Sequence, residues 1–206
     1  IYTPRTLFPY TTLFRSTFEF AYRYAEDELV YLPITAMTSL APVRLTITAH
    51  NIPDGWPITV SCVKNPEELN SDADGDEPYY FAKLVDADTI ELNTVNATCW
   101  KTYTSGGLAV FRKPVDLTGY KARMWIKTRV GGDVLLKLDS DPATLPAGTI
   151  QIDTALSAFI PKLSAEATQL LTWSKGVYDF EAITPTGEVY AIAAISAVTV
   201  SDEVTQ

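Results

Sequence analysis

The chain has 206 residues, of which 47% are hydrophobic and 20% are charged, a composition typical of a globular protein of one large or two small domains. Its 25 acidic and 16 basic residues give a net charge of -9, which repels phosphate backbones and anionic lipids, so we expect neither nucleic acid nor a membrane as a partner. The sequence contains no run of about 18 apolar residues and no basic segment leading into an apolar one, and we therefore expect neither a spanning helix nor a secretory signal.

The first residues match a known artefact. Residues 7–16 read LFPYTTLFRS, which resembles the translation of a common sequencing-library adapter. We therefore expect residues 1–16 to be an artefact that makes few contacts with the fold. The alternative is an ordinary first strand, because Phe8, Tyr10 and Leu13 are apolar.

Strand patterns dominate the first half of the remaining chain. Residues 18–24 place four aromatic side chains on one face, the period of two that predicts a half-buried strand. An acidic turn and a proline-containing linker with short extended pieces follow over residues 25–42. Two hairpins are then predicted over residues 43–63 and 79–93, separated by a polar surface loop, and a glycine turn over residues 103–107 ends this half.

The second half begins a new strand pattern at Lys113. Strands are predicted at residues 121–128, 134–138, near 149–153 and 157–161, at 177–183 and at 189–200. Ser164 has the hydroxyl of a helix cap and Glu166 lies in the first turn, so one short helix is predicted to start at Ser164. These patterns together predict an all-β fold with a single short helix.

Residues that carry chemistry are sparse. His50 is the only histidine and lies at a predicted strand end, with no GxSxG motif elsewhere, so a nucleophilic triad is not indicated. Cys62 and Cys99 lack the paired spacing of a zinc site, and in strand-like surroundings we expect both to be small buried side chains. Substitution of His50, Asp72, Asp74 and Asp76 together by neutral residues is expected to leave folding and assembly nearly intact.

The acidic loop resembles part of a calcium site. Asp72, Asp74 and Asp76 alternate as hard-cation ligands do, but Gly75 is misplaced and no glutamate follows at the twelfth position, so we expect a solvated loop. The segment Asn96-Ala97-Thr98 has the form of a glycosylation sequon and is interpreted as a turn. We expect no catalytic, cofactor-binding or metal-ligating residue, no cofactor and no enzymatic activity.

The second half resembles small tail and baseplate proteins of tailed bacteriophages. The segment VDLTGYKARMWIKTRVGGDVLLKL, followed by LSAEATQLLTW, GVYDFEAITPTGEVY and VTVSDEVT, is similar to the N-terminal domain of the upper baseplate protein family. Asp116 to Gly119 match the opening of the family's second strand, Gly176, Tyr178 and Glu181 match a later strand, and residues 18–24 match the first. The departure is an insert of about 80 residues, 33–112, between the first strand and the DLTG segment.

The insert has a likeness of its own. LTITAHNIPDGWPITVSCV, LVDADTIELNTVNAT and YTSGG are similar to the β-barrel module called the first catalytic cysteine half-domain in ubiquitin-activating enzymes. The catalytic cysteine of those enzymes lies outside this module, so the likeness implies a fold and no ubiquitin chemistry. Together the resemblances imply a discontinuous immunoglobulin-like β-sandwich of residues 17–32 and 113–206, with residues 33–112 inserted as a small β-barrel.

The resemblance implies a function. We expect a non-enzymatic structural subunit of a phage tail or baseplate, located in the virion after synthesis in the host cytoplasm, that docks onto other tail proteins and forms a homo-oligomer. The alternative is a carbohydrate-binding or receptor-binding module, in which Trp56, Trp100 or Trp125 stacks on sugar rings.

Overall fold

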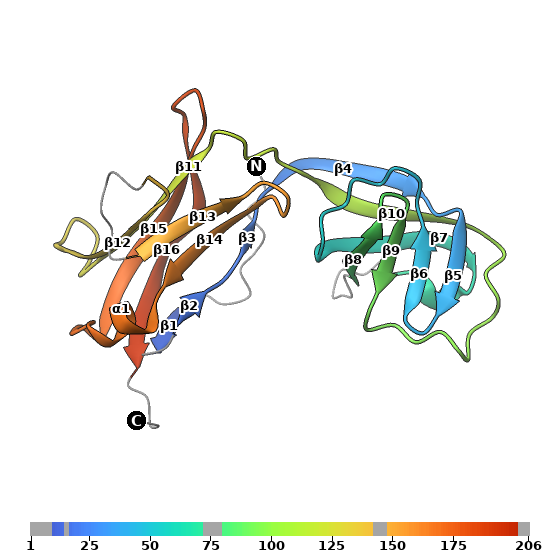
Figure 1. Cartoon of the computed structure of the whole chain (residues 1–206), viewed down its shortest axis with the longest axis horizontal. Helices are drawn as coiled ribbons and strands as arrows, with labels where there is room; N and C mark the ends of the chain where they lie inside the picture. The colour runs from blue at the N-terminus through green and yellow to red at the C-terminus, as the bar shows by residue number, and fades with distance from the viewer. Residues whose placement is uncertain (1–9, 15–16, 72–79, 142–147, 202–206) are drawn as a thin grey trace. The chain divides into compact units, whose positions relative to one another are not determined.

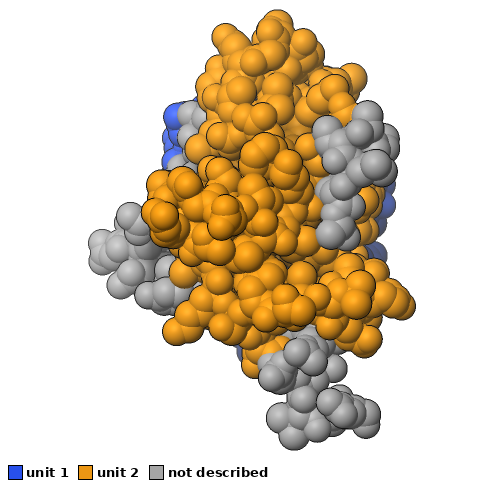
Figure 2. Space-filling view, turned by 90° about the vertical axis from the view of Figure 1, so that its left-hand side faces the viewer, with its two compact units in different colours: residues 1, 25–114 blue, residues 2–24, 115–206 orange. Residues whose placement is uncertain are grey.

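A computed structural model describes residues 10–14, 17–71, 80–141 and 148–201 (Figure 1). The fold is all-β, as predicted, because the described residues are mostly in strands and form one short α-helix. Its contacts divide the chain into two compact units, coloured separately in Figure 2. We call residues 25–114 the inserted unit, and residues 2–24 and 115–206 the host unit.

The host unit is a single nine-stranded sheet with the order β1-β16-β15-β11-β12-β13-β14-β2, in which β3 also pairs with β14. Its strands are β1 (Tyr10–Phe14), β2 (Phe18–Glu19), β3 (Tyr22–Arg23), β11 (Lys121–Lys127), β12 (Val134–Asp139), β13 (Gly148–Asp153), β14 (Ala158–Leu163), β15 (Lys175–Ile183) and β16 (Val189–Ser201). Helix α1 (Ala165–Gln169) follows β14, and the Ser164 hydroxyl caps it by accepting a hydrogen bond from the Ala167 N–H, as predicted.

This sheet folds over into a sandwich-like pair of layers. The Tyr22 ring lies 4.9 Å from that of Phe180 on β15, and the Phe159 ring on β14 lies 6.2 Å from Phe180, so β3 and β14 pack against β15 although they are distant in the strand order. The fold-over occurs at β12 and β13, which pair in parallel. Gly148 permits it, because a Cβ there would lie 2.5 Å from Leu163 Cδ2 and 2.7 Å from the Lys162 carbonyl oxygen.

The aromatic segment 18–24 joins the host core, as predicted. Tyr22 and Tyr24 are buried, and Phe18 and Phe20 pack against the same cluster. The segment is nevertheless two short strands rather than one. The register pairs Glu19 with Lys162 and Tyr22 with Phe159, which sets Phe20 opposite Pro161, and proline has no N–H to donate to the ladder.

The inserted unit is a seven-stranded sheet around its own core, with the order β4-β10-β7-β8-β9-β6-β5. Its strands are β4 (Ala25–Pro33), β5 (Ala36–Leu40), β6 (Val43–Thr46), β7 (Trp56–Asn65), β8 (Tyr80–Asp86), β9 (Thr89–Leu92) and β10 (Ser105–Pro114), and the 3-10 helix η1 (Glu67–Leu69) follows β7. Only Ile34 and Thr35 separate the two outermost strands, β4 and β5, in the chain. Trp56, 1% exposed, lies at the centre of the core.

The insert enters and leaves the host at one place. Ala25 and Pro114 face each other in the β4–β10 pair, and the Val115 N–H donates to the Tyr24 carbonyl oxygen at 3.2 Å. The division therefore falls at residues 24/25 and 114/115, so residues 25–32 and 113–114 belong with the insert rather than with the sandwich. The reason is that β4 pairs with β10 and not with any strand of the host unit.

Three local expectations are wrong. The acidic segment expected as a turn is the start of β4, where Glu26 pairs with Lys113 across an edge strand open to water. The glycine turn expected at 103–107 is instead the start of β10, where Gly106 and Gly107 take positive φ values of 81° and 107°. Residues 10–14, expected to make few contacts, form β1 and pair in parallel with residues 197–201 of β16.

Candidate functional site

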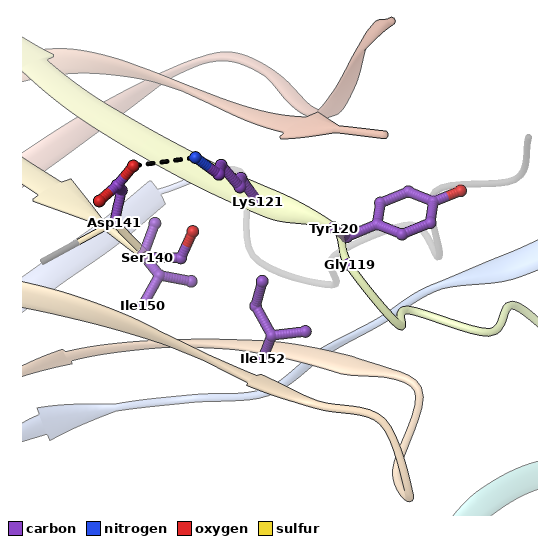
Figure 3. Close-up of a pocket in the computed structure, with 7 residues that line it drawn as sticks. All are labelled: Gly119, Tyr120, Lys121, Ser140, Asp141, Ile150 and Ile152. Atoms are coloured by element: carbon purple, nitrogen blue, oxygen red, sulfur yellow. Dashed lines mark hydrogen bonds and ion pairs between the residues drawn. The ribbon is translucent and has the colours of Figure 1, made fainter. Parts of the chain in front are cut away.

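A hollow of the host unit lies where β11 begins (Figure 3). It has a volume of about 390 Å³ and opens widely to solvent. Its lining residues come from the start of β11, the end of β12 and β13: Gly119, Tyr120, Lys121, Ser140, Asp141, Ile150 and Ile152. A hollow this open, with two isoleucines on its floor, offers contact area without enclosing a ligand.

The DLTG segment forms the turn beside this hollow. The Asp116 carboxylate accepts hydrogen bonds from the Thr118 N–H at 2.9 Å and the Thr118 hydroxyl at 2.7 Å. These bonds favour the ionised carboxylate and lower the pKa of Asp116. Gly119 follows with a φ of 76°, a conformation suited to glycine. The DLTG motif of the resemblance is thus a turn that leads into β11, and the Asp116 carboxylate bonds to Thr118 within the turn.

The charged groups of the hollow neutralise each other. In Figure 3, Lys121 and Asp141 point toward one another, with Nζ 2.9 Å from Oδ2, while the Tyr120 ring points away from them. The hydrogen bond and charge of Asp141 raise the pKa of Lys121, so its ammonium stays protonated at neutral pH. The Ser140 hydroxyl accepts a bond from the Ala122 N–H. None of the seven lining residues is a histidine or cysteine.

His50 has a structural role that the sequence analysis missed. It is only 3% exposed, although its neutral substitution was expected to leave folding intact. Its Nδ1 accepts from the Ile52 N–H at 2.9 Å, and its Nε2 lies 3.0 Å from the Asp86 carbonyl oxygen, to which it donates in the neutral tautomer. The imidazole therefore joins the turn before Ile52 to the end of β8, and its neutral substitution is no longer expected to be harmless.

Cys62 and Cys99 are exposed free thiols, so the expectation that both are buried is wrong. Cys62 lies on β7 with a positive φ of 60°, next to a register shift opposite Ser105 and Gly106. Such a bulge turns one side chain out of the regular alternation, which sequence periodicity does not reveal. The sequon segment is a turn, as predicted, because the Trp100 N–H donates to the Ala97 carbonyl oxygen at 3.0 Å.

Asp72, Asp74 and Asp76 lie outside the described residues. Among the residues that are described, no three His, Cys, Asp or Glu side chains gather as metal ligands would. In the same residues no helix has the length and apolarity needed to span a bilayer.

The three candidate sugar-stacking tryptophans have different environments. Trp56 is a core residue whose Nε1–H donates to the Arg112 carbonyl oxygen at 3.0 Å, so it offers no face to a ligand. Trp100 is half-buried against the insert core. Trp125 is on the outer face of β11, with Lys137 Nζ 4.2 Å from its ring centroid and Lys127 Nζ at 5.5 Å. The lysines cover the indole by cation–π contact.

Apolar and aromatic side chains, interleaved with the polar Arg112 and Thr59, lie on the outside of the inserted sheet. Register places Tyr31 opposite Val110, Leu29 opposite Arg112 and Pro57 opposite Phe81, so these side chains share one face across β4, β10, β7 and β8. Phe81 is 66% exposed, Tyr31 58% and Leu29 44%. We call this surface the insert face: Leu29, Tyr31, Pro57, Phe81, Leu108 and Val110.

The insert face was not identified from the sequence, although a signal was present. Residues 29–32 read LVYL, apolar on both faces of a strand, where a half-buried strand alternates apolar with polar. Val30 and Leu32 pack on the insert core, so Leu29 and Tyr31 are apolar residues left outside. An exposed apolar and aromatic patch of this kind is typical of interaction surfaces.

No protein-family model matches this chain, and no curated protein matches its sequence.

Proposed function

We propose that the chain is a non-enzymatic structural subunit of a bacteriophage tail or baseplate, which docks onto other tail proteins. The insert face carries this proposal: an aromatic and aliphatic surface on a rigid sheet is suited to burial against a partner protein. The order of the DLTG, GVYDFE and terminal VTVSDEVT segments, which resembles upper baseplate proteins, supplies the biological setting.

The proposal includes the finer architecture. The host unit would be the baseplate-type, immunoglobulin-like sandwich, and the inserted unit would be the barrel module that carries the docking surface. The ion-paired and widely open hollow beside Gly119 supports a docking role over a catalytic one, because its charged groups already neutralise each other.

The test is co-assembly with the structural proteins encoded beside this chain's gene. After co-expression, the parent chain is expected to elute together with those proteins in size-exclusion chromatography. The double variant Tyr31→Asp, Phe81→Asp is expected to elute alone, because its two new carboxylates would be buried without partners in the interface. The matched control is Val134→Asp with Leu170→Asp, which adds the same charge at exposed positions of the host unit. Equal co-assembly by both variants, or none by the parent chain, contradicts the proposal.

The alternative, a carbohydrate-binding or receptor-binding module, is favoured by one observation. Trp125 lies on an outer face, and its buried Nε1–H has no hydrogen-bond partner among the described residues. A glycan array separates the two functions. Binding by the parent chain that Trp125→Ala removes would favour the sugar-binding function, whereas binding to no glycan favours the structural one.

A further inference from the structure

Basic side chains gather around Trp125 on the outer face of the host sheet. Register places Lys137 on β12 opposite Trp125 on β11, and Lys127 on β11 opposite Val177 on β15. The residues that alternate with them in each strand are buried, so these side chains point outward. We call this region the basic surface: Trp125, Lys127, Arg129, Val130, Lys137, Lys175, Val177 and Ile195.

The cations of the basic surface are not neutralised within the part of the chain that the structure describes. In that part, no carboxylate forms an ion pair with any of the four, which are Lys127, Arg129, Lys137 and Lys175. In the same unit Lys121, Arg123 and Lys162 each have a carboxylate oxygen within 2.9 Å. Asp133 and Asp179 lie beside the four cations, so positive charge remains in excess there.

A small hollow lies within the basic surface. Its volume is about 60 Å³, and its lining includes Trp125, Val130, Val177 and Ile195. Val130 is 66% exposed and Ile195 61%, so both would lose apolar surface to water on contact with a partner. Pockets for small molecules have about 300 Å³ or more, so this hollow holds a single side chain rather than a whole ligand.

The indole of Trp125 is already in contact with cations. Lys137 Nζ lies 4.2 Å and Lys127 Nζ 5.5 Å from its ring centroid. A sugar ring would have to displace these ammonium groups before it could stack on the indole. A carboxylate, in contrast, is attracted to the same ammonium groups where they stand. The arrangement therefore favours an acidic protein over a sugar.

We propose that the basic surface binds an acidic segment of a partner protein, in which carboxylates flank one apolar side chain. The apolar side chain enters the hollow, and the carboxylates pair with the four cations around it. Charge complementarity selects this partner. Salt screens charges beyond about 8 Å, so the local cations govern a short segment although the whole chain is acidic. A long polyanion such as nucleic acid would also meet the acidic remainder of the chain.

The inference does not rest on the proposed function. It concerns the host unit, whereas the docking proposal concerns the insert face, and Tyr31→Asp with Phe81→Asp leaves the basic surface unchanged. Failure of one proposal is therefore distinguishable from failure of the other.

Fluorescence anisotropy of a labelled peptide, GEEDLEEG, titrated with the full chain tests the proposal. In about 50 mM salt the parent chain is expected to bind with a Kd of about 10–100 μM, and about 500 mM salt should weaken this at least tenfold. Arg129→Glu with Lys175→Glu, both at exposed positions, should also weaken binding at least about tenfold. The matched control, Lys64→Glu with Lys101→Glu, reverses the same charge at exposed positions of the inserted unit and should bind like the parent chain.

A second peptide tests the hollow. Replacing the leucine of the peptide by glycine should weaken binding about tenfold, because its apolar side chain is no longer buried. If the double glutamate variant fails to fold, Lys137→Ala is held to the same direction of change. No binding by the parent chain at about 1 mM overturns the proposal, as does equal weakening by the variant and its control. Binding of dextran sulfate but not of the peptide would overturn it in favour of an anionic polysaccharide.

Discussion

The edge strands β4 and β16 address the same physical problem in opposite ways. β4 has nine residues, of which three are acidic, and Lys113 of the neighbouring strand pairs with both Glu26 and Glu28. β16 is longer, at 13 residues, and has no charge. An incoming strand would have to bury the carboxylates of β4, whereas on β16 it meets alanine, serine and short apolar side chains. The difference teaches that the two sheets of one chain protect their edge strands unequally.

The comparison assumes that the two units are separate in stability as well as in contacts. Trp56→Ala in the insert core should lower the free energy of unfolding of the inserted unit by about 3–5 kcal/mol, because it leaves a large cavity. Native-state hydrogen exchange should show faster exchange in β6, β7 and β9 only. Phe180→Ala, also fully buried, should produce the reverse pattern in β11 and β15. Equal loss in both units from either variant would mean a single cooperative fold.

The second prediction concerns the fold-over of the host sheet. Gly148→Ala should destabilise the host unit by about 2–3 kcal/mol, since the added methyl group meets the Lys162 carbonyl oxygen as well as Leu163. Chemical denaturation monitored by host-unit tryptophan fluorescence measures this. Gly131→Ala is the control with open space around its Cβ, although its φ of 72° will cost some strain. A Gly148→Ala loss no larger than the control's would contradict this account of the fold-over.

The third prediction concerns His50 in the inserted unit. His50→Ala should lower the free energy of unfolding of that unit by about 1–2 kcal/mol, because the Ile52 N–H and the Asp86 carbonyl oxygen lose their partner. The measurement is the melting temperature of His50→Ala compared with that of His50→Asn, whose side chain keeps one donor and one acceptor. A smaller loss in His50→Asn would show that the hydrogen bonds, rather than the volume of the ring, stabilise the unit. Melting of His50→Ala at the parent temperature would restore the original expectation that its neutral substitution leaves folding intact.

The smallest expected effect on stability tests the protection of β4 directly. Glu26→Gln, Asp27→Asn and Glu28→Gln together should change stability by less than about 1 kcal/mol, since exposed ion pairs contribute little. The same change should increase self-association in sedimentation experiments, because β4 loses its charges. Glu67→Gln, Glu68→Gln and Asp133→Asn remove equal charge from exposed positions and serve as the control. If both variants associate equally, net charge rather than edge protection explains the effect.

Periodicity predicted most strands because their inward residues alternate regularly. On β11, Ala122, Met124 and Ile126 are buried and the residues between them are partly exposed, as the sequence pattern indicated. The helix cap at Ser164 is equally local, since donor and acceptor lie three residues apart. Strand alternation and helix capping depend only on residues a few positions apart in the chain, so a single sequence is enough to predict them.

The features that were missed depend on partners distant in sequence. The acidic start of β4 looks like a turn until β10 is placed beside it, with Lys113 against Glu26. His50 looks exposed until Asp86 supplies a bond from 36 residues away. The insert face is a property of several strands in register, and neither periodicity nor a short motif encodes which strands lie side by side in a sheet.

The junction between the two units has an evolutionary consequence. Because Tyr24 and Val115 are hydrogen-bonded and Ala25 faces Pro114, the segment between them behaves toward the host as a hairpin turn would, whatever its length. A lineage could exchange this whole segment as a cassette, by recombination at two closely spaced points of the structure, without altering the register of β3 on β14 or of β11 on β15. The surface that the insert presents would then change in a single event, while the core of the host unit stayed the same.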